Sequence, residues 1–320
     1  MRALYFPLWF LFYLLSLLPF WVVYGISDLI CFFLYHIFGY RKKVVSANLK
    51  LAFPDKSDSE ILQLERGFYR NLCDVMAEFL KMPSISESEL RKRVIFKNTE
   101  VLQQLAGNGT NAVAVISHMC NWEWGALALA GVADRFMCLG VYKPLTNSHF
   151  DDYFKKMRSR FGLVMIPMKA TYRALKSDYQ KPVLLNLIAD QTPTLSKIEH
   201  EALFLGISTP VFLGPEKIAT AARYPVLYFT MRRTGRGKYE VEIKIIATPS
   251  SGNSWLIPDS KGIPHTYSHQ TVTENHLITT AHLQLLESEI LLNPSDWLWS
   301  HRRWKHSGKS PFAVTVTHKV

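Results

Sequence analysis

The feature that most constrains the fold of this 320-residue chain is an apolar run without charged residues at positions 3–27. A helix needs about 20 apolar residues to cross the hydrocarbon core of a bilayer, and this run is longer. Residues 29–40 add a shorter apolar stretch, which ends at Arg41-Lys42-Lys43. A cleaved signal peptide fits poorly, because the apolar region is too long and only Arg2 precedes it. We therefore predict that residues 1–40 form a retained N-terminal hydrophobic membrane-anchor helix.

The basic triplet that follows the anchor also predicts its orientation. Lys and Arg next to a membrane segment are retained on the cytoplasmic side, so we expect residues 41–320 in the cytoplasm. Pro7 and Pro19 interrupt the apolar run, and they leave a kinked or interfacial segment as an alternative to a straight span. A single span and a hairpin that folds back are both open at this point.

Residues 41–320 have the composition of an ordinary folded domain, and we interpret them as one α/β domain. Segments typical of strands alternate with segments typical of helices, which predicts a largely parallel central sheet flanked by helices. The expected strands are 112–117, 136–142, 163–167 and 183–189, with a hairpin formed by 226–232 and 239–246. The expected helices are 44–53, 59–82, 122–132, 150–161, 172–179, 216–223 and 270–292.

The net charge of +11 predicts an anionic partner. The whole excess lies in residues 41–320, since residues 1–40 carry only Arg2 and Asp28. An anionic membrane surface fits this charge, and so does a phosphorylated or acyl-carrier substrate. Residues 297–305 combine three tryptophans with basic side chains, as nucleic acid binding segments do. The anchor argues against nucleic acid, so we expect this segment to face the membrane or to cap the sheet.

The cysteines and histidines show no metal-binding pattern. The four cysteines have no paired spacing, which argues against a disulfide framework or a zinc ribbon and fits a reducing compartment. His265, His269 and His276 lie near a loop-to-helix junction without cysteine support, so we expect no metal site there.

The sharpest local motif is Ser117-His118-Met119-Cys120-Asn121-Trp122-Glu123, which follows an expected strand and opens an expected helix. His118 and Glu123 are five residues apart, so they converge only if a turn lies between them. That turn would place both at the carboxyl end of a strand, where open α/β sheets bind ligands. A His held by a carboxylate is a general base for a hydroxyl group or a water molecule. The alternative is structural: a hydrogen-bonded His at a strand end and a Glu that the helix dipole favours.

Ser117 and Cys120 flank this pair and are candidate covalent nucleophiles. The Gly-x-Ser-x-Gly elbow is absent around Ser117. Cys120 has a nearby histidine and no further support from the sequence. We therefore expect that the reaction does not pass through an acyl-enzyme.

Two further pairs of candidate site residues lie at the ends of expected strands. Tyr142 ends the expected strand 136–142 and Lys143 follows it, and Asp190 and Gln191 follow the apolar strand 183–189. A carboxylate at the end of a buried strand is a reasonable site residue. The alternative for Asp190 is a helix or turn cap.

A basic helix supplies a third group of candidates. Arg158 and Arg160 lie near its end, together with Lys155 and Lys156. These cations would dock a phosphate group or the acidic surface of an acyl carrier. The alternative is a solvated basic face without a binding role.

Eight segments spread over the chain, in order, share a pattern with one known family. The segments are Tyr40-Arg41-Lys42-Lys43-Val44-Val45, Asn48-Leu49, Ala52-Phe53-Pro54, Phe68-Tyr69-Arg70-Asn71, His118 with Asn121-Trp122-Glu123, Val141-Tyr142-Lys143-Pro144, Asp190-Gln191 and Trp299-Ser300-His301-Arg302-Arg303-Trp304-Lys305. Their combination resembles the lipid A late acyltransferase family, which is similar in its core to the His-x4-Asp glycerolipid acyltransferases. The chain departs from the family where Lys143 replaces an arginine, which weakens the case for a bidentate clamp.

The resemblance implies acyl transfer from an acyl thioester to a hydroxyl group of a membrane lipid. It implies that His118 deprotonates the acceptor hydroxyl and that Glu123 orients His118. The implied donor is an acyl carrier protein or coenzyme A thioester, the implied acceptor is a lipid A precursor, and neither a metal nor an organic cofactor is implied. The implied place is the bacterial inner membrane, on its cytoplasmic side. The implied substrate-binding residues are Asn121, Tyr142, Lys143, Arg158, Arg160, Asp190 and Gln191.

Two rival functions are open. The first keeps the chemistry and changes the acceptor to a lysophospholipid or an aminoacyl lipid, because function belongs to the site and not to the fold. The second changes the class of protein, to a thioesterase-like hydrolase or to a membrane scaffold that has lost activity. A scaffold would tolerate loss of His118, and a hydrolase would release free fatty acid without any lipid acceptor.

Overall fold

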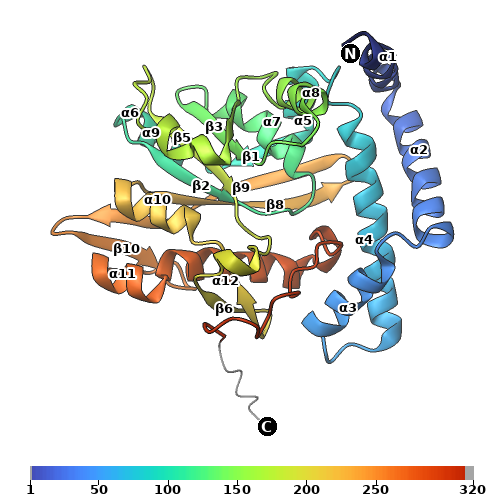
Figure 1. The fold of residues 1–320 in the computed structure, drawn as a ribbon. Helices are drawn as coiled ribbons and strands as arrows, with labels where there is room; N and C mark the ends of the chain where they lie inside the picture. The colour runs from blue at the N-terminus through green and yellow to red at the C-terminus, as the bar shows by residue number, and fades with distance from the viewer. Residues whose placement is uncertain (1, 314–320) are drawn as a thin grey trace.

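The computed structural model describes residues 2–313, and a mixed β-sheet with helices on both faces forms its centre (Figure 1). Within those residues the main sheet has nine strands in the order β11-β10-β9-β8-β2-β5-β3-β4, and β1 pairs with β9. The strands are β1 (Val94–Lys97), β2 (Ala112–Ile116), β3 (Met137–Tyr142), β4 (Val164–Pro167), β5 (Val183–Ile188), β8 (Val226–Gly235), β9 (Lys238–Ser250), β10 (Ser254–Pro258) and β11 (Pro264–Ser268).

The sheet is parallel on one side and antiparallel on the other. Strands β8, β2, β5, β3 and β4 each run parallel to the next, and β1 runs parallel to β9. The pairs β8–β9, β9–β10 and β10–β11 are antiparallel. The prediction of a largely parallel central sheet is therefore confirmed, and so is the hairpin, which is β8 and β9. A separate two-stranded sheet consists of β6 (Glu201–Phe204) and β7 (Ile207–Pro210).

Helices cover both faces of the sheet because the strands bury side chains on both sides. In β2, Ala112 and Ala114 belong to one apolar core, whereas Val113 and Val115 belong to the other. The helices of the first face are α5 (Glu87–Arg93), α6 (Glu100–Gly107), α7 (Trp122–Val132) and α8 (Ser148–Arg158). The helices of the second face are α9 (Thr171–Leu175), α10 (Gly214–Ala222), α11 (His269–Asn275) and α12 (Leu277–Leu292).

The apolar leader forms two helices that separate at Pro19, one of the two prolines expected to interrupt it. These are α1 (Arg2–Leu17) and α2 (Phe20–Phe32), and the short helix η1 (Phe33–Ile37) continues α2. Pro19 has an extended backbone (φ −61, ψ 152), and its ring removes the N–H that a continuous helix would need. Residues 20–37 are long and apolar enough to cross a membrane, by length and composition alone. Anchoring of this segment in a membrane stays a prediction.

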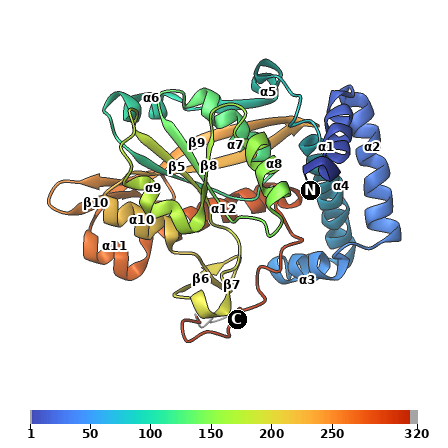
Figure 2. The same ribbon diagram turned by 45° about the horizontal axis from the view of Figure 1, so that its top comes forward.

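The helix α2 lies beside α4 (Asp58–Phe79) in both ribbon views (Figures 1 and 2). The predicted start of α4 is confirmed, because Ser57 and Glu60 form a reciprocal capping box. The helix α3 (Lys42–Ala52) connects the leader to α4, so the boundary we expect between anchor and body falls between η1 and α3.

The helix predicted at 270–292 is interrupted. His276 has a left-handed backbone (φ 50) and separates α11 from α12. Glu216 of α10 holds this break, since its carboxylate lies 2.8 Å from His276 Nδ1 and accepts a 2.8 Å hydrogen bond from the backbone N–H of Thr279. A carboxylate at the first turn of α12 supplies the acceptor that the orphan N–H groups need.

Candidate active site

His118 lies in the turn between β2 and α7, as predicted from the strand and helix patterns on either side of it. Its backbone N–H donates to Asp190 Oδ2 over 2.8 Å, and its ring Nδ1 lies 2.6 Å from Asp190 Oδ1. Asp190 follows β5, which is the parallel neighbour of β2, so both residues stand where two strands end. One carboxylate thus fixes the backbone and the ring of the histidine together.

Asp190 is buried and takes a third hydrogen bond, from Trp297 Nε1 to Oδ2 over 2.9 Å. Burial alone would raise the pKa of this carboxyl, but the charge of His118 and the hydrogen bonds that Asp190 accepts lower it by more. The net pKa of Asp190 is therefore below its usual range, and the carboxylate stays ionised.

The ring of His118 has one nitrogen bound to the carboxylate and one turned toward Gln191. Burial lowers the pKa of His118, but attraction to the Asp190 charge, their hydrogen bond and the charge of Glu123 raise it by more. The net pKa of His118 is above its ordinary value. Gln191 Nε2 lies 3.3 Å from His118 Nε2. This network assigns the proton to Nδ1 and leaves Nε2 as the acceptor.

The expectation that Glu123 orients His118 is not met by this geometry. Glu123 instead forms a two-point ion pair with Arg158, with Arg158 Nε 2.7 Å from Oε2 and Nη2 2.5 Å from Oε1. The planar guanidinium matches both carboxylate oxygens, so it outcompetes a single imidazole N–H. Asp190 is the hydrogen-bonded carboxylate of His118, and Glu123 acts on it only through its charge.

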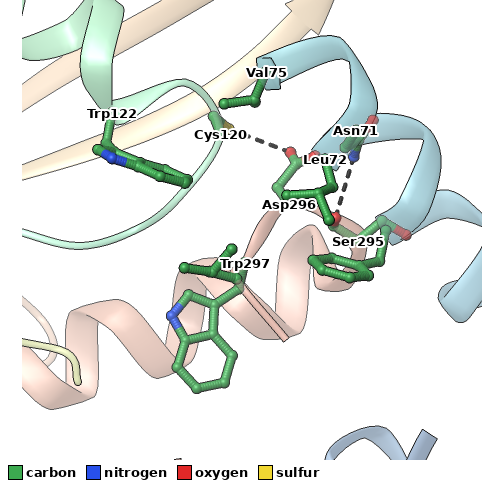
Figure 3. Close-up of a pocket in the computed structure, with 10 residues that line it drawn as sticks. Asn71, Leu72, Val75, Cys120, Trp122, Ser295, Asp296 and Trp297 are labelled. Atoms are coloured by element: carbon green, nitrogen blue, oxygen red, sulfur yellow. Dashed lines mark hydrogen bonds between the residues drawn. The ribbon is translucent and has the colours of Figure 1, made fainter. Parts of the chain in front are cut away.

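The segment after α12 contacts the turn that carries His118, as Figure 3 shows for Cys120 and Asp296. Cys120 has a left-handed backbone (φ 51), and its N–H donates to the carbonyl oxygen of Asp296 over 2.8 Å. Asn71 of α4 donates to the carboxylate of Asp296 over 2.5 Å, so α4 helps to hold the same segment. Met119 forms a single β-bridge with Trp297, the residue that also contacts Asp190.

Neither candidate nucleophile is accessible. Cys120 is 4% exposed, and its thiol lies against Met231 O and Asp296 Oδ2. Burial, followed by the charge of Asp296, raises the pKa of this thiol well above its usual value. Ser117 is 3% exposed, and its Oγ lies 3.3 Å from Tyr228 Oη. A protonated, buried thiol and a buried hydroxyl are poor nucleophiles.

Tyr142 is the last residue of β3 and lies near Arg158, and Lys143 follows it. Tyr142 Oη donates to Asp151 Oδ2 over 2.9 Å, and Asp151 Oδ1 accepts from the backbone N–H of Leu145 over 2.8 Å. Asp151 therefore holds the loop that follows the strand. Lys143 lies on that loop with its side chain exposed to solvent.

Two predicted substrate-binding residues have other partners. Asn121 is fully buried: its Oδ1 caps α7 by accepting from Trp124 N over 2.9 Å, and its Nδ2 donates to Glu78 over 2.7 Å. Arg160 donates to the carbonyl oxygen of Met82, and its guanidinium lies over the ring of Phe161. The Asn121 amide is thus used inside the protein, whereas Arg160 is exposed and has one backbone partner. Contact of either residue with substrate stays a prediction.

The histidines considered for metal binding are paired with other groups. His265 lies 3.1 Å from an Asp259 oxygen, and His269 Nδ1 accepts a 3.4 Å hydrogen bond from Trp255 Nε1. His276 contacts Glu216, as described above. Among residues 2–313 no group of three or more His, Cys, Asp or Glu side chains is placed to hold a metal ion.

Two residues near the site, Trp297 and Glu78, were not among the predicted site residues. Trp297 donates to Asp190, and Trp299 and Trp304 pack against it in the core. The segment 297–305 therefore supports the site from inside and does not present its tryptophans to a membrane. Glu78 receives the amide of Asn121. The only sequence signal for Trp297 was the density of tryptophans around it, and Glu78 had none.

The arrangement is suited to remove a proton from a hydroxyl group or a water molecule. His118 Nε2 is the acceptor, and the buried Asp190 carboxylate stabilises the imidazolium that forms. The Glu123–Arg158 pair lies beside it as a fixed charge pair whose guanidinium keeps further N–H donors for an anion.

Comparisons with known proteins agree on one family. A family model described as bacterial lipid A biosynthesis acyltransferase matches residues 2–306. The chain is 22% identical over 121 residues to lipid A biosynthesis acyltransferase 2 of Shigella flexneri, and the match covers 38% of each chain. It is 22% identical over 265 residues to the lipid A biosynthesis palmitoleoyltransferase of Escherichia coli (strain K12), covering 83% of this chain and 79% of the relative.

A third relative, lipid A biosynthesis acyltransferase of Shigella flexneri, matches with the same identity and the same coverage as the Escherichia coli protein. The first alignment spans less than half of that relative's length, whereas the family model spans nearly all of this chain. This extent agrees with the resemblance found in eight separate segments of the sequence. The chain belongs to the bacterial lipid A biosynthesis acyltransferase family.

Proposed function

We propose that this chain transfers an acyl group from an acyl thioester to a hydroxyl group of a lipid A precursor. The reaction type is supported by membership of the family, whose model covers nearly the whole chain. The observation that carries the assignment of the base is the two-point contact between His118 and the buried Asp190. Both residues lie at the ends of parallel strands, where α/β sheets bind ligands.

In the proposed reaction His118 Nε2 takes the proton of the acceptor hydroxyl as its oxygen attacks the thioester carbonyl carbon. A carbon–oxygen bond forms, and the carbonyl oxygen carries the negative charge of a tetrahedral intermediate. The carbon–sulfur bond then breaks, and the imidazolium gives its proton to the leaving thiolate. Asp190 stabilises the imidazolium between these two proton transfers. The step needs no covalent enzyme intermediate, no metal and no organic cofactor.

We assign Glu123 and Arg158 to substrate positioning within this proposal. The Arg158 side chain is 26% exposed, so it is not closed off from solvent. Arg158 has two nitrogens on Glu123 and keeps further N–H groups for a phosphate. Lys143, exposed on the neighbouring loop, would add a second positive charge. A lipid A precursor and the phosphate-bearing carriers of acyl thioesters both supply such an anion.

The names of the relatives guide the choice of donor and acceptor. The Escherichia coli relative is named a palmitoleoyltransferase of lipid A biosynthesis, which supports a long acyl chain as the transferred group. We propose an acyl carrier protein or coenzyme A thioester as donor. A lysophospholipid or an aminoacyl lipid is the alternative acceptor for the same catalytic group.

We propose that the leader holds the protein on the cytoplasmic leaflet of the inner membrane without crossing it. On α2, Ser27 donates to Asp74 of α4 over 2.7 Å, so one face of the helix is bound to the body. Elsewhere on α2 large apolar side chains are exposed, and Trp21 has an exposed fraction of 77%. Phe38, just after η1, has an exposed fraction of 76%. A spanning α2 would carry the charged α4 into the hydrocarbon core, whereas an interfacial hairpin would not.

The test is a transfer assay with the purified full chain in detergent, with labelled acyl groups on acyl carrier protein and on coenzyme A. A lipid A precursor and a lysophospholipid are offered side by side, and His118→Ala is the matched control. We expect labelled lipid A precursor from the wild type and none above background from the variant. If only the lysophospholipid were acylated, the acceptor would be a lysophospholipid and not a lipid A precursor. Free fatty acid without lipid product, or full activity of His118→Ala, would contradict the proposal.

A further inference from the structure

Glu78 is a carboxylate with no exposed surface, at the last turn of α4. Its side chain accepts hydrogen bonds from three side chains of three different elements. Oε2 accepts from Asn121 Nδ2 and from Tyr239 Oη, each over 2.7 Å, and Oε1 accepts from Tyr24 Oη over 3.0 Å. All three donors are neutral. Burial raises the pKa of Glu78, and these hydrogen bonds act in the opposite direction.

One of these hydrogen bonds reaches the turn that carries the catalytic base. Asn121 is the N-cap of α7, three residues after His118 and two before Glu123. Its Oδ1 accepts from Trp124 N while its Nδ2 donates to Glu78, so Glu78 fixes which way the capping amide faces. The carbonyl oxygen of Glu78 also accepts from Trp124 Nε1 over 3.2 Å. The start of α7 is thus held by α4 at two points.

Another of these hydrogen bonds reaches the apolar leader. Tyr24 lies on α2, on the side that faces α4. The same helix also contacts the start of α7 directly, because the ring of Phe20 meets Trp124 edge to face with ring centroids 6.0 Å apart. The outer side of α2 is apolar and exposed, so contact with lipid would set its depth and rotation.

We infer that Glu78 is a positioning residue that couples the packing of α2 against α4 to the geometry of the turn carrying His118 and Glu123. We call α2 seated when it packs on α4 with the Tyr24–Glu78 hydrogen bond formed. The inference rests on the proposed function for its activity readout. When α2 is seated, Tyr24 and Asn121 share one carboxylate, and the cap of α7 is fixed. When α2 is displaced, Oε1 of Glu78 loses its donor, and the carboxylate is held through Oε2 alone, so its orientation toward Asn121 is less fixed. A membrane surface that seats α2 would therefore assemble the catalytic turn.

The chain offers a matched pair of variants. Tyr24→Phe removes the α2 hydroxyl that donates to Glu78, and Ser27→Ala removes the α2 hydroxyl that donates to Asp74. Both weaken the contact between α2 and α4 by one hydrogen bond, but only the first touches Glu78. Asn121→Ser is the third variant, since serine keeps the N-cap acceptor and loses the amide that donates to Glu78.

The first measurement is steady-state transfer with the full chain on vesicles of phosphatidylethanolamine and phosphatidylglycerol that contain the acceptor. We expect Tyr24→Phe and Asn121→Ser each to lower kcat about tenfold with little change in KM, because each leaves the turn misplaced. The double variant should be no slower than the slower single variant, since both break the same connection. Ser27→Ala should keep kcat within about twofold of the wild type.

The second measurement does not depend on activity, so it separates this inference from the proposed function. Hydrogen exchange is followed at the amides of residues 119–124, with and without the same vesicles but without substrate. We expect vesicles to slow exchange there in the wild type and in Ser27→Ala, and not in Tyr24→Phe. An equal response of Tyr24→Phe and Ser27→Ala would overturn the coupling. A wild type without transferase activity that still shows this difference would contradict the proposed function alone.

Discussion

The two carboxylates on either side of the catalytic turn have different partners. Asp190 is paired with an imidazole, which gains and loses a proton near neutral pH. Glu123 is paired with a guanidinium, which stays charged at all relevant pH values. In the proposed mechanism a carboxylate therefore belongs to a proton-transfer unit on one side of the turn and to a fixed ion pair on the other. The partner of each carboxylate, and not its distance from His118 in the sequence, decides its role.

This difference also explains how one turn can serve two purposes. Trp297, which donates to Asp190, belongs to the core on one face of the sheet, whereas Arg158 comes from α8 on the other face. The base is fixed from inside the protein by groups that do not titrate with it. The Arg158 side chain of the ion pair is partly exposed, and we propose that a substrate anion binds there. A substitution can therefore remove the His118–Asp190 contact without removing the Glu123–Arg158 ion pair, or the reverse.

Loss of the base is expected to have the largest effect. His118→Ala should lower the rate of acyl transfer by about a thousandfold, because it removes the proposed acceptor of the hydroxyl proton. The rate is measured with saturating donor and acceptor, and thermal unfolding of the variant confirms that it folds. A rate within about tenfold of the wild type would exclude His118 as the general base.

Loss of the carboxylate charge behind the base is expected to come next. Asp190→Asn should lower kcat by about a hundredfold, because an amide would neither hold the Nδ1 proton nor stabilise the imidazolium. Asp152→Asn, an exposed acidic residue on α8, is the control and should leave kcat unchanged. Equal kcat values for the Asp190 variant and the wild type would remove Asp190 from the mechanism.

The fixed ion pair is expected to affect binding more than chemistry. Arg158→Lys keeps the charge and loses the two-point contact with Glu123, so KM for the acceptor or the donor should rise about tenfold. Arg160→Lys is the matched control, because Arg160 contacts Met82 and Phe161 instead. A larger change in KM from the Arg160 variant would reverse our assignment of the two arginines.

The smallest effect is expected at the buried thiol. Cys120→Ser should change the transfer rate by less than about threefold, since the Cys120 thiol is buried and its raised pKa keeps it protonated. Mass spectrometry of the wild type after mixing with donor alone should show no acylated protein. An acyl group on Cys120, together with an inactive Cys120→Ser variant, would contradict direct transfer and indicate an acyl-enzyme intermediate.

Much of the fold could be predicted from local patterns. The strand before His118 and the helix after it lie where apolar runs and helical periodicity placed them, and α7 has the predicted bounds. The short strand β1 was missed because its four residues pair with β9, far along the chain. The break at His276 was missed because Glu216, 60 residues earlier, supplies the cap that ends the regular pattern.

The site was predictable only in part, for the same physical reason. Asp190 was expected at the end of a buried strand, but its contact with His118 spans 72 residues and depends on β5 pairing with β2. Spacing within one motif therefore suggested Glu123 as the partner. Asn121 was predicted to bind substrate because it lies between His118 and Glu123 in the sequence, but its amide donates inward to Glu78. Sequence patterns identify where a strand ends, and the pairing of strands decides which side chains meet.

The most direct test of the central claim is the pH dependence of kcat/KM in Asp190→Asn and Glu123→Gln. The base must be neutral to act, so activity falls as the pH drops through the pKa of His118. In the wild type Asp190 holds that pKa above its ordinary value, and Glu123 contributes less. We predict that Asp190→Asn moves this acidic limb to clearly lower pH, while Glu123→Gln moves it only slightly. A larger shift in Glu123→Gln, or none in Asp190→Asn, would contradict the assignment of Asp190 as the carboxylate behind the base.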